Sequence, residues 1–327
     1  MPETYSGTHL ITGVAGQDGV LLSRLLSREG VDVVGTVRPG SGEAAAMAPY
    51  LSGVQVVEHD VRDTDGFRDL LAQHDPDVVY NLAAASSVGR SWAEPELTMA
   101  VNGDAVLGML DVLAQRPEVR FVQASSAEIL RPGAPSPYAR AKLRAHEATR
   151  RARESGRFCS AAVLHMHESP LRAPTFVMRK VTRAVAEIAE GRREAVTLGN
   201  LDARRDWGSA VDSVRALRLL AAAPGPAEVE VCTGEVWCLR DLVAHAFATA
   251  RIADPWAHVQ LDAGLRRPAD DDELAGDPKP IRRFLSWTPR VPIKETIAQM
   301  VTTDRRRLVT GVEEDPAYLA GLDDRLA

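Results

Sequence analysis

Short apolar stretches alternate with longer amphipathic ones through the first half of the chain. The apolar stretches are residues 8–12, 31–37, 53–59, 78–82, 119–123 and 160–165. Helical periodicity marks residues 20–26, 64–74, 98–115 and 138–154 between them. Strands joined by crossover helices build a parallel sheet, so this order predicts an α/β fold with a doubly wound parallel sheet.

The second half of the chain shows the same alternation less regularly. Amphipathic helices are predicted at residues 176–190, 212–222 and 293–308, with a strand at 228–232. A chain of 327 residues can form two unequal domains. We expect a larger nucleotide-binding domain (1–170 with about 208–255) and a smaller C-terminal α/β substrate-binding domain (about 171–207 with 256–327).

A glycine-rich turn follows the first predicted strand. It reads Gly13-Val14-Ala15-Gly16-Gln17-Asp18-Gly19 and runs into a helix. Strand, G-x-x-G-x-x-G and helix form the context of a dinucleotide fingerprint, in which the pyrophosphate lies on the helix N-terminus. The predicted cofactor contacts in this turn are Gly13, Gly16, Gln17, Asp18 and Gly19.

The ends of the next strands indicate which dinucleotide binds. Arg38 follows the second strand, where an acid would bind the ribose of NAD and an arginine accommodates the 2′-phosphate of NADP. NADP is therefore the predicted cofactor, with NAD as the alternative. Further predicted cofactor contacts are Asp60 and Val61 after the third strand, and Leu82, Ala83 and Ala84 after the fourth.

Candidate chemistry gathers after the strand at 119–123. Ser126 and Glu128 follow this strand directly, and Tyr138 and Lys142 come at i, i+4 on one face of the next helix. A nearby lysine favours a phenolate, which gives an acid or base for a hydroxyl group. The sequence thus predicts proton transfer at this point of the sheet.

Composition excludes several other functions. The net charge of -6 and aromatic content of 5% offer neither a basic footprint nor a stacking platform for nucleic acid. The three cysteines lack metal-ligand spacing, and Leu171 stands where His167-Glu168 would need a second histidine to bind zinc, so no metal is predicted. No signal segment or apolar run of about 20 residues is evident, and a cytoplasmic location is expected without a membrane partner.

Taken together, these stretches resemble the extended short-chain dehydrogenase/reductase family, and within it the GDP-mannose 4,6-dehydratases. The resemblance runs from Ile11 to about Asp304. Its most specific pieces are residues 11–19, 80–84, 167–170, 176–180, 199–208 and 267–269.

The resemblance implies a Rossmann fold, a cofactor that borrows and returns a hydride, and a GDP-linked sugar as substrate. Tyr138 would act as base with Lys142 lowering its pKa, Ser126 would bind the sugar 4-oxygen, and Glu128 would remove the C5 proton as water leaves C6. A homodimer or homotetramer is also implied. Tyr138, Lys142 and His165 would also contact the cofactor. The implied substrate contacts are Ser86, Glu168, Arg172, Val177, Arg179, Lys180, Gly199, Asn200, Arg205 and Arg267.

Departures from the family pattern leave other functions open. Ala127 replaces the polar residue that dehydratases keep before the glutamate, and Ser-Ser-Ala is typical of sugar-nucleotide 4-epimerases. Met166 and Leu171 stand where the family has a substrate-contacting Asn and an Arg, which favours a modified or longer sugar. The alternatives are a GDP- or NDP-sugar 4-epimerase and a non-catalytic NADP-binding subunit.

Overall fold

The computed structural model describes residues 7–265 and 273–326. Arg267, one of the predicted substrate contacts, lies outside the described residues. Within the described ranges, no helix is both long enough and apolar enough to span a bilayer.

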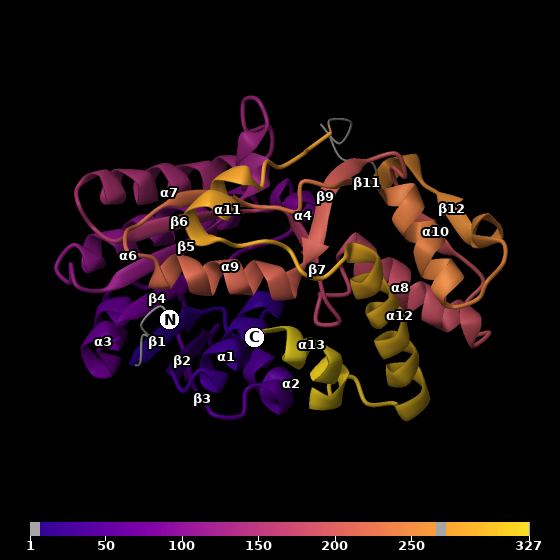
Figure 1. Cartoon of the computed structure of the whole chain (residues 1–327), viewed down its shortest axis with the longest axis horizontal. Helices are drawn as coiled ribbons and strands as arrows, with labels where there is room; N and C mark the ends of the chain where they lie inside the picture. The colour runs from indigo at the N-terminus through magenta and orange to yellow at the C-terminus, as the bar shows by residue number, and fades with distance from the viewer. Residues whose placement is uncertain (1–6, 266–272, 327) are drawn as a thin grey trace.

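In the described part of the chain, seven parallel strands form the main sheet in the order β10-β6-β5-β4-β1-β2-β3 (Figure 1). Their bounds are β1 (Thr8–Thr12), β2 (Asp32–Val37), β3 (Val54–Glu58), β4 (Val78–Asn81), β5 (Arg120–Ser126), β6 (Cys159–Leu164) and β10 (Glu228–Val231). The predicted doubly wound sheet is confirmed. The order reverses between β1 and β4, and ligands of open sheets bind at the carboxyl ends of strands beside such a point.

Helices cover both faces of this sheet, because successive side chains of a strand point to opposite faces. Ile11 belongs to the core of one face and its neighbour Leu10 to the core of the other. The first face carries α1 (Gln17–Arg28), α9 (Ala210–Ala222), α11 (Lys279–Leu285) and α13 (Ala320–Leu326). The second carries α3 (Thr64–His74), α6 (Ala105–Leu113) and α7 (Pro137–Glu154).

The helix predicted at 98–115 is divided by a π-helical turn. It consists of α5 (Pro95–Met99), the turn η2 (Ala100–Asp104) and α6. Within the turn, the Asn102 amide donates to the carbonyl oxygen of Ala85 at 3.0 Å and accepts from its backbone N–H at 2.8 Å. The turn therefore fixes the loop after β4 at the edge of the sheet where a ligand is expected.

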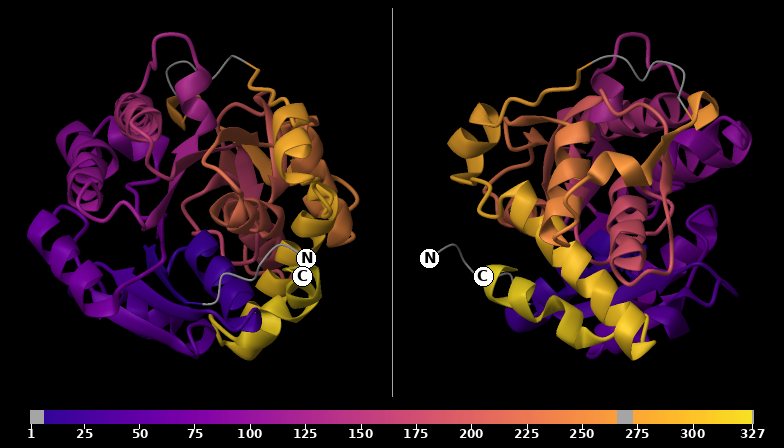
Figure 2. Two further views of the ribbon diagram at one scale, coloured as in Figure 1. Left: turned by 60° about the vertical axis from the view of Figure 1, so that its left-hand side comes forward. Right: turned by 90° about the vertical axis from the view of Figure 1, so that its right-hand side faces the viewer.

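A smaller lobe forms around a second core (Figure 2). Its helices are α8 (Val177–Ala189), α10 (Leu239–Thr249) and α12 (Ile293–Thr310). Its two small sheets, β11-β9-β7 and β12-β8, comprise β7 (Met166–Glu168), β8 (Val196–Leu198), β9 (Arg204–Ser209), β11 (Val236–Cys238) and β12 (Val259–Leu261). Val243 and Phe247 of α10 pack into this core, although the sequence analysis places residues 239–249 in the larger domain. The domain boundaries remain a prediction.

Short elements connect these parts. They are α2 (Glu43–Met47), η1 (Ala48–Tyr50), α4 (Val88–Ser91), η3 (Ala127–Leu130), η4 (Pro255–His258), η5 (Ala263–Leu265) and η6 (Pro316–Leu319). Of these, η3 directly follows strand β5 and carries candidate chemistry.

Candidate active site

A cavity of about 270 Å³ lies at the carboxyl end of the main sheet, with walls from both lobes. Many of the predicted site residues line it: Asp18, Leu82, Ala84, Ser86, Ser126, Glu128, Tyr138, Lys142, His165, Arg172, Val177, Gly199, Asn200 and Arg205. Others lie outside its wall: Gly13, Gly16, Gln17, Gly19, Arg38, Asp60, Val61, Ala83, Glu168, Arg179 and Lys180. The fold thus brings the predicted catalytic residues together with a part of the predicted binding residues.

The end of β5 places a hydroxyl and a carboxylate in this cavity. Ser126 is the last residue of β5, and its side chain accepts a hydrogen bond from the Glu128 backbone N–H at 3.3 Å, which starts η3. The Glu128 carboxylate forms an ion pair with Arg131, whose Nε lies 2.9 Å from Oε2. Ala127 between them is buried and also lines the cavity.

Helix α7 supplies the phenol and the ammonium. Ser136 caps the helix by accepting from the Ala139 N–H at 3.0 Å, and Pro137 occupies the first turn. Tyr138 and Lys142 are both buried one turn apart. The Lys142 Nζ donates to the carbonyl oxygen of Ala124 on β5 at 2.9 Å, so the helix is fixed against the strand that carries Ser126.

The pKa values at this site differ from the sequence-based expectation. Burial raises the pKa of Tyr138 above its ordinary value, and the hydrogen bond with Ser126 acts in the opposite direction without offsetting it. We expected Lys142 to lower this pKa. Burial instead lowers the pKa of Lys142 itself to about 8, and the negative charge of Asp18 opposes that shift.

The glycine-rich turn fits a dinucleotide. Gly13 has a φ of +72°, and a Cβ there would lie 2.9 Å from the Ala83 Cα. A Cβ at Gly19 would lie 2.5 Å from the Gly13 carbonyl oxygen, so only glycine lets α1 pack this closely on the turn. Gly16, exposed and without a side chain, leaves the start of α1 uncapped, which suits an anionic pyrophosphate.

The adenosine end of the predicted cofactor site is charged and exposed. Arg38 follows β2, and its guanidinium lies 3.1 Å from a carboxylate oxygen of Glu43. Asp60, after β3, forms an ion pair with Arg62 that holds the pKa of this carboxyl at about 2. The structure therefore places a cation at the end of β2, as the sequence predicts for a 2′-phosphate site.

The predicted substrate arginines fall into two environments. Arg172 and Arg205 line the cavity, and Arg172 stacks on Phe176 with its guanidinium carbon 3.7 Å from the ring centre. Arg179 is buried in the small lobe and pairs with Asp304 at 2.9 Å. The structure does not bring Arg179 to the cavity, because the Asp304 carboxylate of α12 holds the guanidinium inside the small lobe.

Glu168 was also predicted to bind substrate, but it does not line the cavity. It is fully buried on β7, and burial raises the pKa of its carboxyl. Its nearest cation is Arg172, whose Nε lies 3.4 Å from Oε2. Glu168 thus lies behind a cavity residue, where its charge can act on Arg172.

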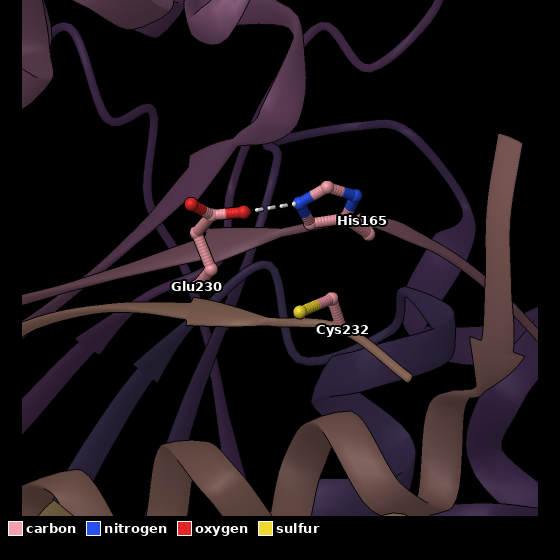
Figure 3. A group of neighbouring side chains, drawn as sticks. All are labelled: His165, Glu230 and Cys232. Atoms are coloured by element: carbon pink, nitrogen blue, oxygen red, sulfur yellow. Dashed lines mark hydrogen bonds and ion pairs between the residues drawn. The ribbon is translucent and has the colours of Figure 1, made fainter. Parts of the chain in front are cut away.

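A cluster of donor side chains lies at the ends of β6 and β10 (Figure 3). The donor atoms of His165, Glu230 and Cys232 all lie within 4.8 Å of one another. His165 Nε2 already pairs with Glu230 at 3.0 Å, and burial raises the pKa of the Cys232 thiol. A Cβ at Gly276 would lie 2.5 Å from the Cys232 sulfur, so the cluster is tightly packed and hydrogen-bonded, and of its members only His165 lines the cavity.

Several cavity residues were missed by sequence reasoning. They are Ser87, Val88, His167, Thr175, Phe176, Ala203, Asp206, Trp207, Leu239, Leu265 and Leu274. His167 carried a signal, because it lies in the H-E-S-P stretch that resembles the family, but it was weighed individually only as a zinc ligand and given no role in the site. Trp207 also lies in a stretch that resembles the family, residues 199–208. Leu239 carried no such signal, because α10 reaches the cavity only through the packing of the small lobe.

This strand order, with a glycine-rich turn between β1 and α1 and a buried Tyr138–Lys142 pair, gives the molecule a Rossmann-like α/β fold. Comparisons with known proteins show which family has this sequence and fold. A sequence model of the family described as GDP-mannose 4,6 dehydratase matches residues 10–300. The GDP-mannose 4,6-dehydratase of Vibrio cholerae is 32% identical, and the alignment covers 90% of this chain and 93% of the relative.

Two solved structures share the fold. DesIV (dTDP-glucose 4,6-dehydratase) from Streptomyces venezuelae, with NAD and TYD bound, is 22% identical with a TM-score of 0.81, covering 92% of this chain and 98% of its own. RMD from Pseudomonas aeruginosa, complexed with NADPH, is 21% identical with a TM-score of 0.76, covering 92% and 98%. The chain belongs to the GDP-mannose 4,6-dehydratase family, and it is a nucleotide-sugar dehydratase or epimerase.

Proposed function

We propose that the chain is an NADP-dependent 4,6-dehydratase of a GDP-linked, mannose-like sugar. The observation that carries this proposal is the presence of Glu128 in one cavity with Ser126, Tyr138 and Lys142. Oxidation of an alcohol needs only the last three residues, so the carboxylate is the group that an elimination would add. The GDP-linked substrate is supported by the name of the Vibrio cholerae relative.

Each side chain has a role in this reaction. The bound nicotinamide would accept a hydride from C4 of the sugar and return one at C6. Tyr138 takes the proton of the C4 hydroxyl, and Ser126 hydrogen-bonds the C4 oxygen. Lys142 holds the helix that carries Tyr138 against β5 through its hydrogen bond to Ala124. The 4-keto group acidifies C5, so Glu128 removes the C5 proton and delivers it to the C6 oxygen, which leaves as water. When C6 then takes the hydride, C5 takes a proton that exchanges with solvent, which balances the proton that Tyr138 removed from the C4 hydroxyl.

The cofactor preference rests on Arg38, since β2 ends in this cation and an arginine there accommodates a 2′-phosphate. RMD binds NADPH and DesIV binds NAD, which supports a nicotinamide cofactor in this fold. We also propose a homodimer or homotetramer, which analytical ultracentrifugation would test.

The test is incubation with GDP-mannose followed by mass spectrometry in D₂O. We expect loss of one water, deuterium at C5 of the product, and cofactor retained by the enzyme. Glu128→Gln should abolish the deuterium incorporation, whereas Asp65→Asn, at an exposed carboxylate of α3, should leave it in place. Unchanged product mass with a new sugar isomer would reject the dehydratase.

The second candidate is a 4-epimerase, and Ala127 is the observation that favours it. Its methyl group lines the cavity beside Glu128 and cannot protonate a leaving hydroxyl. An epimerase would use Ser126, Tyr138 and Lys142 and return the hydride to the other face of C4. In that case Glu128→Gln would leave isomer formation largely intact.

A further inference from the structure

An ion pair joins the glycine-rich turn to the segment after β6. His167 Nε2 lies 2.9 Å from one carboxylate oxygen of Asp18 and 3.2 Å from the other. Nδ1 of the same ring lies 2.6 Å from the carbonyl oxygen of His165. The side chains of His167 and Asp18 are only 12% and 20% exposed.

Both ring nitrogens therefore face oxygen acceptors. A neutral imidazole carries one N–H and could donate to only one of them, whereas an imidazolium donates to both. A protonated Asp18 would remove the conflict, but Asp18 lies in the first turn of α1 and accepts from Gln17 Nε2 at 3.2 Å. Helix amides and a donor side chain both favour the carboxylate.

We infer that His167 is a buried imidazolium that holds the Asp18 carboxylate and thereby positions the glycine-rich turn for the cofactor. Neutral contacts support the same junction: Gln17 donates to the His167 carbonyl oxygen at 3.2 Å and accepts from the Ser169 hydroxyl at 2.8 Å. The imidazolium adds a positive charge, which offsets the carboxylate close to where a pyrophosphate would lie. This role in binding rests on the proposed cofactor.

The electrostatics of the pair agree with the geometry. Burial alone would lower the pKa of His167, but the charge and hydrogen bond of Asp18 raise it above the ordinary value. His167 in turn holds the pKa of Asp18 low despite burial. The other titratable or charged groups facing the pair are Arg172, which opposes the imidazolium, the buried Glu168, and Tyr138 and Lys142 of α7.

The sign of the pH dependence follows. The His167 pKa is raised, so the imidazolium is complete at low pH and is lost as pH rises through that pKa. Loss of the proton leaves the Asp18 carboxylate uncompensated beside the cofactor phosphates. Affinity for NADPH should therefore fall with rising pH, by about tenfold across the titration.

Two measurements test the inference on the intact protein. The first is ¹⁵N NMR of the histidine rings between pH 6 and 9, assigned with His167→Gln. Both His167 nitrogens should carry protons at pH 7, and a neutral ring at that pH would overturn the inference whether or not any cofactor binds. This measurement is made on the wild-type protein, so it does not depend on the stability of a variant.

The second measurement is NADPH binding by fluorescence over the same pH range. His167→Gln should bind about tenfold more weakly at low pH and lose the tenfold decline, keeping only the change that Lys142 contributes near pH 8. Adding Asp18→Asn should recover the part of the affinity that the uncompensated charge removes. His245→Gln, at a partly buried histidine of α10 in the small lobe, is the matched control and should follow wild type. Flat wild-type affinity would reject the positioning role, while no binding of NADPH or NADH at any pH would reject the proposed function instead.

Discussion

The two lobes each bury a cation, and they stabilise it in different ways. At the cavity, Lys142 of the large lobe is 4% exposed and its ammonium donates to a backbone carbonyl. Inside the small lobe, Arg179 is 2% exposed and pairs with the carboxylate of Asp304 at 2.9 Å. Arg179 also donates to the carbonyl oxygen of Pro170 at 2.7 Å.

This difference separates a functional charge from a structural one. Burial lowers the pKa of Lys142 to about 8, close to the pH at which the protein would work, so the residue can help to move protons. An arginine does not deprotonate in proteins, and Arg179 with Asp304 instead ties α8 to α12. Substitutions at the cavity should therefore affect turnover, and substitutions in the small lobe should affect stability.

The largest effect is expected at Tyr138, next to Lys142. Tyr138→Phe removes the hydroxyl that exchanges the substrate proton, and kcat should fall by about 10³-fold, within the range for a general acid or base. Urea denaturation and NADPH binding should stay close to wild type. Turnover within tenfold of wild type would show that Tyr138 is not the base.

At Arg179 we expect a substitution to lower stability rather than turnover. Arg179→Met removes one of the two cations that pair with the buried Asp304 carboxylate. Asp304 keeps Arg307 at 3.1 Å and the Thr182 hydroxyl at 2.8 Å. Because a buried charge is then only partly compensated, the free energy of unfolding should fall by about 3 kcal/mol. Urea denaturation measures this loss. Arg183→Met, one turn along α8 and half exposed, is the matched control and should cost less than about 1 kcal/mol.

If Arg179 were instead a substrate ligand, as the sequence suggested, its substitution would raise KM without this loss of stability. That result would mean that the buried cations of both lobes are functional, so Arg179 would no longer differ from Lys142 in this respect.

The effect at Lys142 should depend on pH in a defined direction. The folded pKa is about 8 and the ordinary value 10.5, so below about pH 8 folding must bury a charged ammonium, and this cost fades as pH rises toward 10.5. Lys142→Met should therefore stabilise the protein by about 2 kcal/mol at pH 7, after allowing for the lost hydrogen bond.

Denaturation of wild type and Lys142→Met at pH 7 and pH 10 measures this difference. The advantage of the variant should shrink at pH 10, whereas Lys279→Met, at an exposed lysine, should show no such trend. A variant less stable than wild type at both pH values would mean that Lys142 is structural in the same sense as Arg179.

The large lobe could be predicted from the sequence because its signals are local. Residues 64–74 have helical periodicity and form α3, and Gly13 to Gly19 sit between a strand and a helix in the chain as in the fold. Ser126, Glu128, Tyr138 and Lys142 lie on consecutive elements, so their proximity followed from the order of the chain. The π-helical turn at Asn102 was missed because its cause is a tertiary bond to Ala85.

The small lobe was predicted less well for the same physical reason. Strand β9 (Arg204–Ser209) has no apolar run, and its pairing depends on β7 and β11, which are three residues each. Arg179 has the sequence context of a substrate ligand on an amphipathic helix, but its environment is set by Asp304 on a distant segment. Long-range pairing of charges is not visible in a local pattern.

The smallest expected effect is on cofactor binding at Arg38, a cation that is exposed rather than buried. The Arg38 side chain is 69% exposed, so water screens its charge and an interaction there is weaker than in either buried site. Arg38→Ala should weaken NADP binding by about tenfold and leave NAD binding nearly unchanged, because only NADP carries the 2′-phosphate. Calorimetric titration with both cofactors measures this, with Arg68→Ala on the exposed side of α3 as control. Equal losses for NADP and NAD would remove the 2′-phosphate role and leave Arg38 as a solvated partner of Glu43.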